Sequence, residues 1–229
     1  MTIIDNYNKI KDTINETALK CGRNPDMIKI ISVSKTFDML TIQEAIDSGI
    51  RIFGENRIQE ANEKFPQLKG NFELHMIGHL QSNKAREAVS LFEVIHSIDK
   101  VSTALKLDSE AEKKGKIQRV LIQLKTTDEV TKSGAGQSEI FSIAESISGM
   151  KNLKLEGLMS IGPNTADKNL IRKSFIETAE TLDIINSRLN LSLKELSMGM
   201  SGDYTIAIEE GATIVRIGSA IFGNRDYTI

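Results

Sequence analysis

Short apolar segments alternate along this chain with segments whose apolar residues recur at helical spacing. The apolar segments are bounded by polar turns, which is typical of buried β-strands. The predicted strands are 28–34, 50–53, 72–78, 93–98, 117–124, 155–161, 195–200 and 213–218. The predicted helices are 2–21, 41–48, 57–64, 81–90, 100–114, 137–148, 167–189 and 203–210.

Strands that alternate with helices predict a parallel sheet. Eight such strands are the number that closes a (β/α)₈ barrel, and 229 residues fall within the usual size of that fold. A doubly wound open sheet is the alternative, although it usually has fewer strands. No linker interrupts the alternation, so we expect residues 1–229 to form a single α/β domain, a TIM-type barrel with an additional N-terminal helix. Lys125–Gln137 is the most polar stretch, and we expect a mobile loop there.

Composition narrows the class of protein. A formal net charge of -2 gives no reason to expect binding to nucleic acid or to a membrane surface. The single cysteine, Cys21, excludes an internal disulfide. Charged residues near the start of the chain argue against a signal peptide, and no apolar run approaches the roughly 20 residues that span a bilayer. We therefore expect a cytoplasmic protein and a monomer.

The first predicted strand ends in a lysine. Its alternation places Val33 and Lys35 on the same face. A lysine at the mouth of a buried strand is expected to be desolvated, which lowers its pKa and makes the amine nucleophilic enough to form a Schiff base. The alternative is that Lys35 only extends to the surface where the strand ends.

Small and polar residues follow the other predicted strands. Functional residues of (β/α)₈ barrels lie at the carboxyl ends of the strands, so we expect these residues to surround the Lys35 amine. They are Glu55, Asn56, Gly78, His79, Ser97, Ser160, Gly162, Ser201, Gly218 and Ser219.

The turns after the last two predicted strands form a candidate phosphate site. Barrels of this type often bind phosphate there, through backbone N–H groups at the start of a short helix. Ser201, Gly218 and Ser219 suit that role, because glycine permits close approach of the backbone and serine adds hydroxyl donors. The alternative is two ordinary turns, with a Ser/Asp cap that starts the helix 203–210.

Arg216 interrupts an apolar strand. It lies between Val215 and Ile217, and if its face points into the barrel, the buried guanidinium needs a partner. That partner is either a ring nitrogen of a bound cofactor or a carboxylate, Glu209 or Glu55. Because arginine only donates hydrogen bonds, it would leave a pyridine nitrogen unprotonated and make the cofactor a weaker electron sink.

The three histidines do not suggest a metal site. His75 and His79 are four residues apart on a predicted strand, which separates them by roughly 13 Å, and no third ligand motif follows. We expect His79 to line the pocket, and His75 and His96 to be structural.

Sequence blocks spread over nearly the whole chain match a known family. They are Val33-Ser34-Lys35-Thr36, Phe53-Gly54-Glu55-Asn56 with Gln59-Glu60, the block from Ile77 to Lys84, Lys132-Ser133-Gly134, Gly157-Leu158-Met159, the block from Ser197 to Asp203, Val215-Arg216-Ile217-Gly218 and Ile221-Phe222-Gly223. With these blocks the chain resembles the pyridoxal phosphate homeostasis protein family, which is related to the barrel domain of alanine racemase. Leu74 and Thr131 depart from it, where tryptophan and serine are common.

The resemblance implies pyridoxal 5'-phosphate held as a Schiff base on Lys35. It places Asn56 near the ring, Arg216 near the pyridine nitrogen, and Ser201, Gly218 and Ser219 around the phosphate. It also implies a protein that binds, buffers or supplies the cofactor, with apo forms of pyridoxal-phosphate enzymes as recipients and no established reaction.

A racemase-like enzyme is the alternative function. Racemases of the related fold use a tyrosine from another domain as a second base. The tyrosines of this chain are Tyr7, Tyr204 and Tyr227, and none is an obvious second base.

Overall fold

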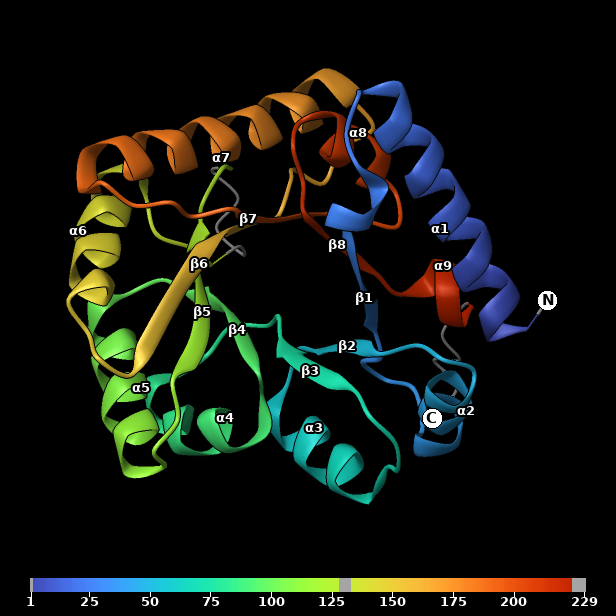
Figure 1. The fold of residues 1–229 in the computed structure, drawn as a ribbon, viewed down its shortest axis with the longest axis horizontal. Helices are drawn as coiled ribbons and strands as arrows, with labels where there is room; N and C mark the ends of the chain where they lie inside the picture. Colours follow the sequence, from blue (N-terminus) through green and yellow to red (C-terminus); the bar gives the residue numbers. More distant parts are fainter. Residues whose placement is uncertain (1, 128–132, 224–229) are drawn as a thin grey trace.

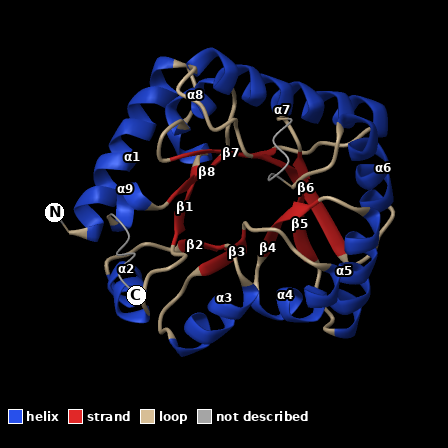
Figure 2. Cartoon of the chain, turned by 180° about the vertical axis from the view of Figure 1, so that it is seen from behind, coloured by secondary structure: helices blue, strands red, loops and turns tan. Residues whose placement is uncertain are grey.

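Each predicted strand forms, and each pairs in parallel with the next, while the last pairs with the first to close a barrel. The computed structural model describes residues 2–127 and 133–223. Figures 1 and 2 show the closed ring of strands with helices around it. The strands are β1 (Lys29–Val33), β2 (Ile52–Glu55), β3 (Glu73–Met76), β4 (Val94–Ile98), β5 (Gln118–Leu124), β6 (Leu153–Ser160), β7 (Glu195–Met200) and β8 (Ile214–Ile217).

The helices follow the strands in the expected order, which confirms the (β/α)₈ fold with an additional N-terminal helix. They are α1 (Ile3–Lys20), α2 (Met39–Asp47), α3 (Ile58–Lys64), α4 (Ala85–Leu91), α5 (Val101–Lys113), α6 (Gln137–Ser148), α7 (Lys168–Leu189), α8 (Tyr204–Glu209) and α9 (Ser219–Phe222). Short 3₁₀ turns occur at Pro25–Met27, Phe65–Gln67 and Ser82–Lys84.

Most boundaries lie within two residues of the predicted ones, and two differences after β3 have local reasons. The predicted strand 72–78 ends at Met76, so Gly78 and His79 belong to the following loop. The predicted helix 81–90 begins as the 3₁₀ turn Ser82–Lys84 and becomes α-helical only at Ala85. Both changes lie at the pocket end of β3, where the chain leaves the sheet early.

Alternate residues of the strands face the two sides of the barrel wall. On β1, Ile30 belongs to the main core, whereas Ile31 and Val33 pack with Ile214 in a separate small cluster. Because side chains alternate along a strand, this second cluster fills the barrel interior and the main core lies between strands and helices. Arg216 is two residues after Ile214, so it also faces the interior.

The N-terminal helix is fixed to the last part of the barrel. Ile10, Ile14 and Ala18 are buried on one face of α1, which packs against α8 and α9 (Figure 1). Arg23 follows the helix and donates to the carbonyls of Ile208, Gly211 and Ala212, at the end of α8. These contacts join the first helix of the described chain to its last two helices.

The predicted loop Lys125–Gln137 can be followed only in part. Residues 128–132, which include Thr131, lie outside the described residues. The described part returns to the end of β5, where Ala135 accepts from the Lys125 N–H and donates to the Gln123 carbonyl.

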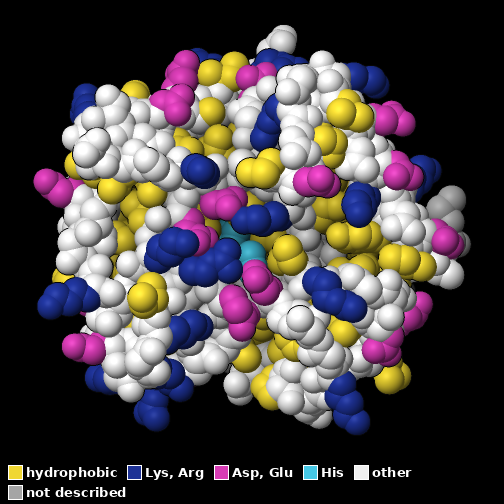
Figure 3. All heavy atoms as spheres, in the orientation of Figure 1, with side chains coloured by type: hydrophobic (Ala, Val, Ile, Leu, Met, Phe, Trp, Pro, Cys, Tyr) yellow, Lys and Arg dark blue, Asp and Glu magenta, His cyan; other side chains and the backbone are white. Residues whose placement is uncertain are grey.

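Charged side chains gather around the barrel axis on the face drawn in Figure 3, with histidine atoms between them. None of the helices in the described part of the chain has the length and apolar composition needed to cross a bilayer.

Candidate functional site

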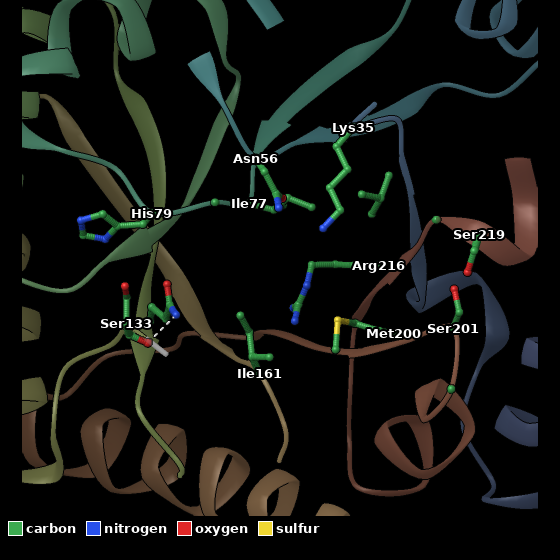
Figure 4. Close-up of a pocket in the computed structure, with 15 residues that line it drawn as sticks. Lys35, Asn56, Ile77, His79, Ser133, Ile161, Met200, Ser201, Arg216 and Ser219 are labelled. Carbon is green, nitrogen blue, oxygen red and sulfur yellow. Dashed lines mark hydrogen bonds between the residues drawn. The ribbon is translucent and has the colours of Figure 1, made fainter. Parts of the chain in front are cut away.

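A cavity of about 460 Å³ opens at the carboxyl ends of the strands. It takes residues from the ends of several strands and from the loops that follow them (Figure 4). The seven residues predicted from sequence all line it: Lys35, Asn56, His79, Ser201, Arg216, Gly218 and Ser219. The fold thus brings together groups that lie as far as 184 positions apart in the numbering, from 35 to 219.

Lys35 extends into the cavity from the end of β1. Its side chain is half-buried, and in Figure 4 its amine and the Arg216 guanidinium point into the same space. The alternative, in which Lys35 only reaches the outer surface, does not describe this geometry. The amine is placed where it can meet a bound aldehyde.

The backbone next to Lys35 is held from outside the cavity. Thr36 has a φ of 71°, an unusual value for a β-branched residue. Its N–H donates to Glu60 Oε1 at 2.5 Å, and Lys64 Nζ lies 2.5 Å from the same oxygen. Lys64 also donates to the Ser34 carbonyl at 3.4 Å. These contacts from α3 fix the turn that carries the lysine.

Glu55 does not belong to the cavity, although its position at the end of β2 suggested that it could. It is fully buried, and its Oε1 accepts from Ser34 Oγ at 2.7 Å, with Lys64 Nζ at 3.6 Å. Its neighbour Gly54 approaches Ile31 of the interior cluster, so Glu55 faces the opposite side of the wall. Burial raises the pKa of the Glu55 carboxyl to about 7, against the opposing effects of Lys64 and Ser34.

Arg216 forms the floor of the cavity. Its Nη1 donates to the Ser197 carbonyl at 2.6 Å and to Ser197 Oγ at 2.8 Å, and its Nη2 donates to the Ser160 carbonyl at 2.8 Å. The alternative carboxylate partners do not pair with Arg216, because Glu209 pairs with Arg172 and Glu55 faces away from the barrel interior. Burial lowers the pKa of Arg216 to about 10, so the group is protonated at neutral pH.

The hydroxyls of Ser201 and Ser219 point toward each other at one end of the cavity (Figure 4). Gly199, near the end of β7, has a φ of 91°, and an added Cβ there would lie 2.6 Å from Ala207 Cβ. Asp203 accepts from the Met200 N–H at 2.5 Å and makes no side-chain cap on α8. Asp203 thus occupies the N-cap position of α8, while its carboxylate closes the turn that presents Ser201.

Asn56 and His79 line the side formed by β2 and β3. The Asn56 side chain points toward the cavity centre, whereas the His79 ring points away from it (Figure 4). His79 is half-exposed, and its Nδ1 lies 3.6 Å from Asp99 Oδ2. At Gly78, an added Cβ would lie 2.2 Å from the Asn56 carbonyl oxygen, so the two loops touch through backbone alone.

Several lining residues were not predicted. Gln123 Nε2 donates to the Ser133 carbonyl at 2.6 Å and joins the loop after β5 to the cavity wall (Figure 4). A polar residue within an apolar strand was its sequence signal, the same signal that marked Arg216. The apolar lining residues have no distinguishing signal. They are Val33, Ile77, Ile161 and Met200.

The histidines on β3 and β4 are buried and bonded to each other, as expected for structural residues. His75 Nδ1 lies 3.0 Å from His96 Nε2. Within residues 2–127 and 133–223, no group of three or more His, Cys, Asp or Glu side chains is arranged to hold a metal ion.

Sequence comparisons assign the family. The model of the alanine racemase N-terminal domain matches residues 6–226. The pyridoxal phosphate homeostasis protein of Vibrio alginolyticus is 40% identical over 232 residues, which cover 99% of each chain. The protein of that name from Escherichia coli K12 is 37% identical over 233 residues, covering 99% of this chain and 98% of its own. This chain belongs to the pyridoxal phosphate homeostasis protein family.

Solved structures agree with this family. PipY of Synechococcus elongatus PCC7942, solved with PLP bound, has a TM-score of 0.81 and 34% identity, covering 92% of this chain and 100% of its own. A protein of unknown function from Bifidobacterium adolescentis reaches a TM-score of 0.89 at 33% identity, covering 96% of this chain and 94% of its own. Alanine racemase of Clostridium difficile 630 shares the fold, with a TM-score of 0.78 at 14% identity, and this chain covers 58% of it.

Proposed function

We propose that this protein binds pyridoxal 5'-phosphate in the cavity at the carboxyl ends of the strands and buffers or supplies it inside the cell. The observation that carries the proposal is the placement of the Lys35 amine, the Arg216 guanidinium and two serine hydroxyls around one cavity. PLP is bound in PipY, a relative with 34% identity.

The chemistry of the lining groups fits this cofactor. A primary amine can bind its aldehyde covalently. A donor-only guanidinium suits an unprotonated ring nitrogen, and paired hydroxyls suit a phosphate. The cavity, about 460 Å³, lies within the range of ordinary small-molecule sites.

Each residue then has a role. Lys35 holds the aldehyde carbon, Arg216 donates to the ring nitrogen, and Asn56 and His79 lie beside the ring. Ser201, Gly218 and Ser219 hold the phosphate. When bound, the cofactor supplies an electron sink, which an arginine partner weakens because it leaves the ring nitrogen unprotonated.

We further propose that the protein carries PLP and does not turn over a substrate. Tyr7 and Tyr204 do not line the cavity, and Tyr227 lies outside the described residues. Of the described lining residues, His79 is the one besides Lys35 and Arg216 with an ionisable side chain, and its ring points away from Lys35 (Figure 4). A racemase-like enzyme remains the competing function.

We also propose that the protein is a cytoplasmic monomer and that apo forms of PLP enzymes receive the cofactor.

Reduction of the PLP-loaded protein with borohydride, followed by peptide mapping, tests the site. The pyridoxyl group is expected on Lys35. A label on another lysine, with Lys35→Ala binding PLP at normal affinity, rejects this cavity as the site. Transfer of bound PLP to an apo-enzyme, followed by the recovered activity of that enzyme, tests the carrier role separately.

A further inference from the structure

A chain of hydrogen bonds crosses the barrel interior from the floor of the cavity to the opposite end. Arg216 Nη1 lies 2.8 Å from Ser197 Oγ, which lies 2.9 Å from His96 Nδ1. His96 Nε2 lies 3.0 Å from His75 Nδ1, and His75 Nε2 lies 3.2 Å from Glu73 Oε2. Glu73 is the first residue of β3 and half-exposed, so the chain ends at the amino ends of the strands.

When both histidines are neutral, the two ends of this chain fix the direction of every proton in it. Arg216 can only donate, so Ser197 Oγ accepts from it and gives its own proton to His96 Nδ1. His96 then carries its proton on Nε2 and donates to His75 Nδ1. His75 likewise carries its proton on Nε2 and donates to Glu73, whose carboxylate can only accept. The two neutral histidines therefore share the same tautomer.

The surrounding charges favour this arrangement. The pKa of His96 is held well below its usual value, first by burial and also by the positive charge of the nearby Arg216. The hydrogen bond from His75 is the main cause that lowers the pKa of Glu73 to about 2, so this end stays a carboxylate. The other charged groups around the chain are Arg119, Glu156, Lys29, Glu195 and Asp203.

We propose that Ser197, His96, His75 and Glu73 form a proton-ordered chain that positions Arg216 and conveys the protonation of the opposite barrel face to the cavity. The residues of the chain are positioning residues, since they act on a ligand through Arg216. The effect on PLP rests on the proposed function, whereas the proton order does not.

One added proton reverses the chain. With His75 protonated on both nitrogens, His96 Nε2 must accept, and His96 carries its proton on Nδ1 and donates it to Ser197. Ser197 Oγ then accepts from both His96 and Arg216, so the guanidinium shares its acceptor. The chain thus has two states that differ by one proton, and the protonated state holds Arg216 less firmly. Such a proton can enter at Glu73, the half-exposed end of the chain, which contacts His75 Nε2.

Nitrogen NMR of the ligand-free protein tests the proton order directly. The whole polypeptide contains only three histidines, so their signals can be assigned by substitution. At neutral pH we expect His75 and His96 to be protonated on Nε2 alone. On acidification, His96 should change tautomer in the step in which His75 becomes charged. The opposite tautomer at either residue, or two independent titrations, overturns the proposal.

Replacing the acceptor at the Glu73 end of the chain by a donor is a sharper test. In Glu73→Lys the end of the chain becomes a donor, so both histidines should move their proton to Nδ1, while Glu73→Gln keeps an acceptor oxygen and the original tautomers. Glu156→Lys is the matched control, because it makes the same charge change beside Arg119 without touching His75. Unchanged tautomers in Glu73→Lys, or the same change in Glu156→Lys, overturns the proposal.

Binding measurements connect the chain to the cavity. Ser197→Ala removes the hydroxyl that accepts from Arg216, and we expect PLP to dissociate about 2- to 10-fold more readily, the range for one hydrogen bond. Ser32→Ala is the control, since Ser32 is a buried strand serine whose Oγ has no partner in the described part of the chain. Equal effects of the two substitutions reject the coupling to Arg216. If no variant binds PLP but the tautomers are as predicted, the proposed function is rejected, whereas the proposed proton order is supported.

Discussion

Thr36 holds a positive φ of 71° directly after the lysine that we assign to the cofactor. A β-branched residue is strained there, so neighbouring contacts must maintain the conformation. The contacts come from Glu60 and Lys64, neither of which lines the cavity. The position of Lys35 therefore depends on side chains of α3. It also depends on whether the neighbouring Glu55 carboxyl is charged.

The Glu55 carboxyl makes the stability depend on pH. Its pKa is about 7 in the folded protein against 4.5 in the reference state. A raised pKa means that the folded state holds the proton more tightly, so this stabilisation is complete below pH 4.5 and is lost as the pH rises to 7. The full change is about 3 kcal/mol, from a shift of about 2.5 units at 1.36 kcal/mol each.

Glu55→Gln should remove this dependence, because an amide keeps the acceptor for Ser34 without the charge. We expect the variant to match the wild type at pH 4.5 and to exceed its free energy of unfolding by up to about 3 kcal/mol at pH 8. Urea denaturation at both pH values measures this. Glu63→Gln, at an exposed position of α3, serves as control. A difference that does not vary with pH contradicts the assignment.

Ser201 should distinguish phosphorylated from unphosphorylated ligand. Ser201→Ala is expected to weaken PLP binding by about 1–3 kcal/mol, the range for hydrogen bonds to charged groups. Pyridoxal, which has no phosphate, should lose much less. Titrations followed by absorbance give both constants, and equal losses indicate that Ser201 acts on the fold.

At the scale of elements, the loops after β2 and β3 touch without side chains. Gly78 allows this, because an added Cβ would lie 2.2 Å from the Asn56 carbonyl oxygen. Nearby Gly202 has no atom within 4 Å of such a Cβ, although it lines the same cavity. The shape of the cavity at Asn56 is therefore set by backbone contact between two loops.

Gly78→Ala should displace Asn56 and weaken PLP binding about 5- to 150-fold, since overpacking costs about 1–3 kcal/mol. Gly202→Ala is the matched control and should bind as the wild type does. The comparison requires only dissociation constants and a check of folding by circular dichroism. Similar affinities for the two variants contradict a role for the loop contact.

The alternation of short apolar runs and amphipathic segments was sufficient to predict the strands and their order. It could not place the end of β3, because apolar Ile77 continues the pattern beyond Met76. It also did not reveal α9, which has only four residues. The contacts of Glu55 depend on whether its side chain faces the barrel interior or the helices. The register of β2 in the sheet determines this, and the local sequence does not reveal it. The residues at the strand ends could be predicted because a (β/α)₈ barrel places the carboxyl ends of all its strands around the same end of the barrel.

For the molecule as a whole, the decisive question is whether the bound cofactor does chemistry. Arg216 is donor-only, and the His79 ring points away from Lys35 (Figure 4). This combination favours a holder of the cofactor over a catalyst.

Incubation of the PLP-loaded protein with L- and D-amino acids in heavy water should give negligible α-deuteration. Mass spectrometry of the amino acids measures it. Exchange or racemisation at about 1 s⁻¹ or faster, as in ordinary enzymes, contradicts the carrier role. His79→Ala is the informative variant in that event, because loss of exchange identifies the ring as the second base.

Closure of the barrel between β1 and β8 also has a consequence for biosynthesis. Lys35, just after β1, precedes Arg216 of β8 by 181 positions in the numbering, yet β1 and β8 pair directly, with Ile31 opposite Arg216. Proteins are synthesised from the N-terminus at about 5–20 residues per second, so the amine is made seconds before its partners. A nascent or truncated chain therefore has a lysine but no pocket. Only finished molecules can sequester the reactive aldehyde, and the amount of complete protein sets the capacity of the reservoir.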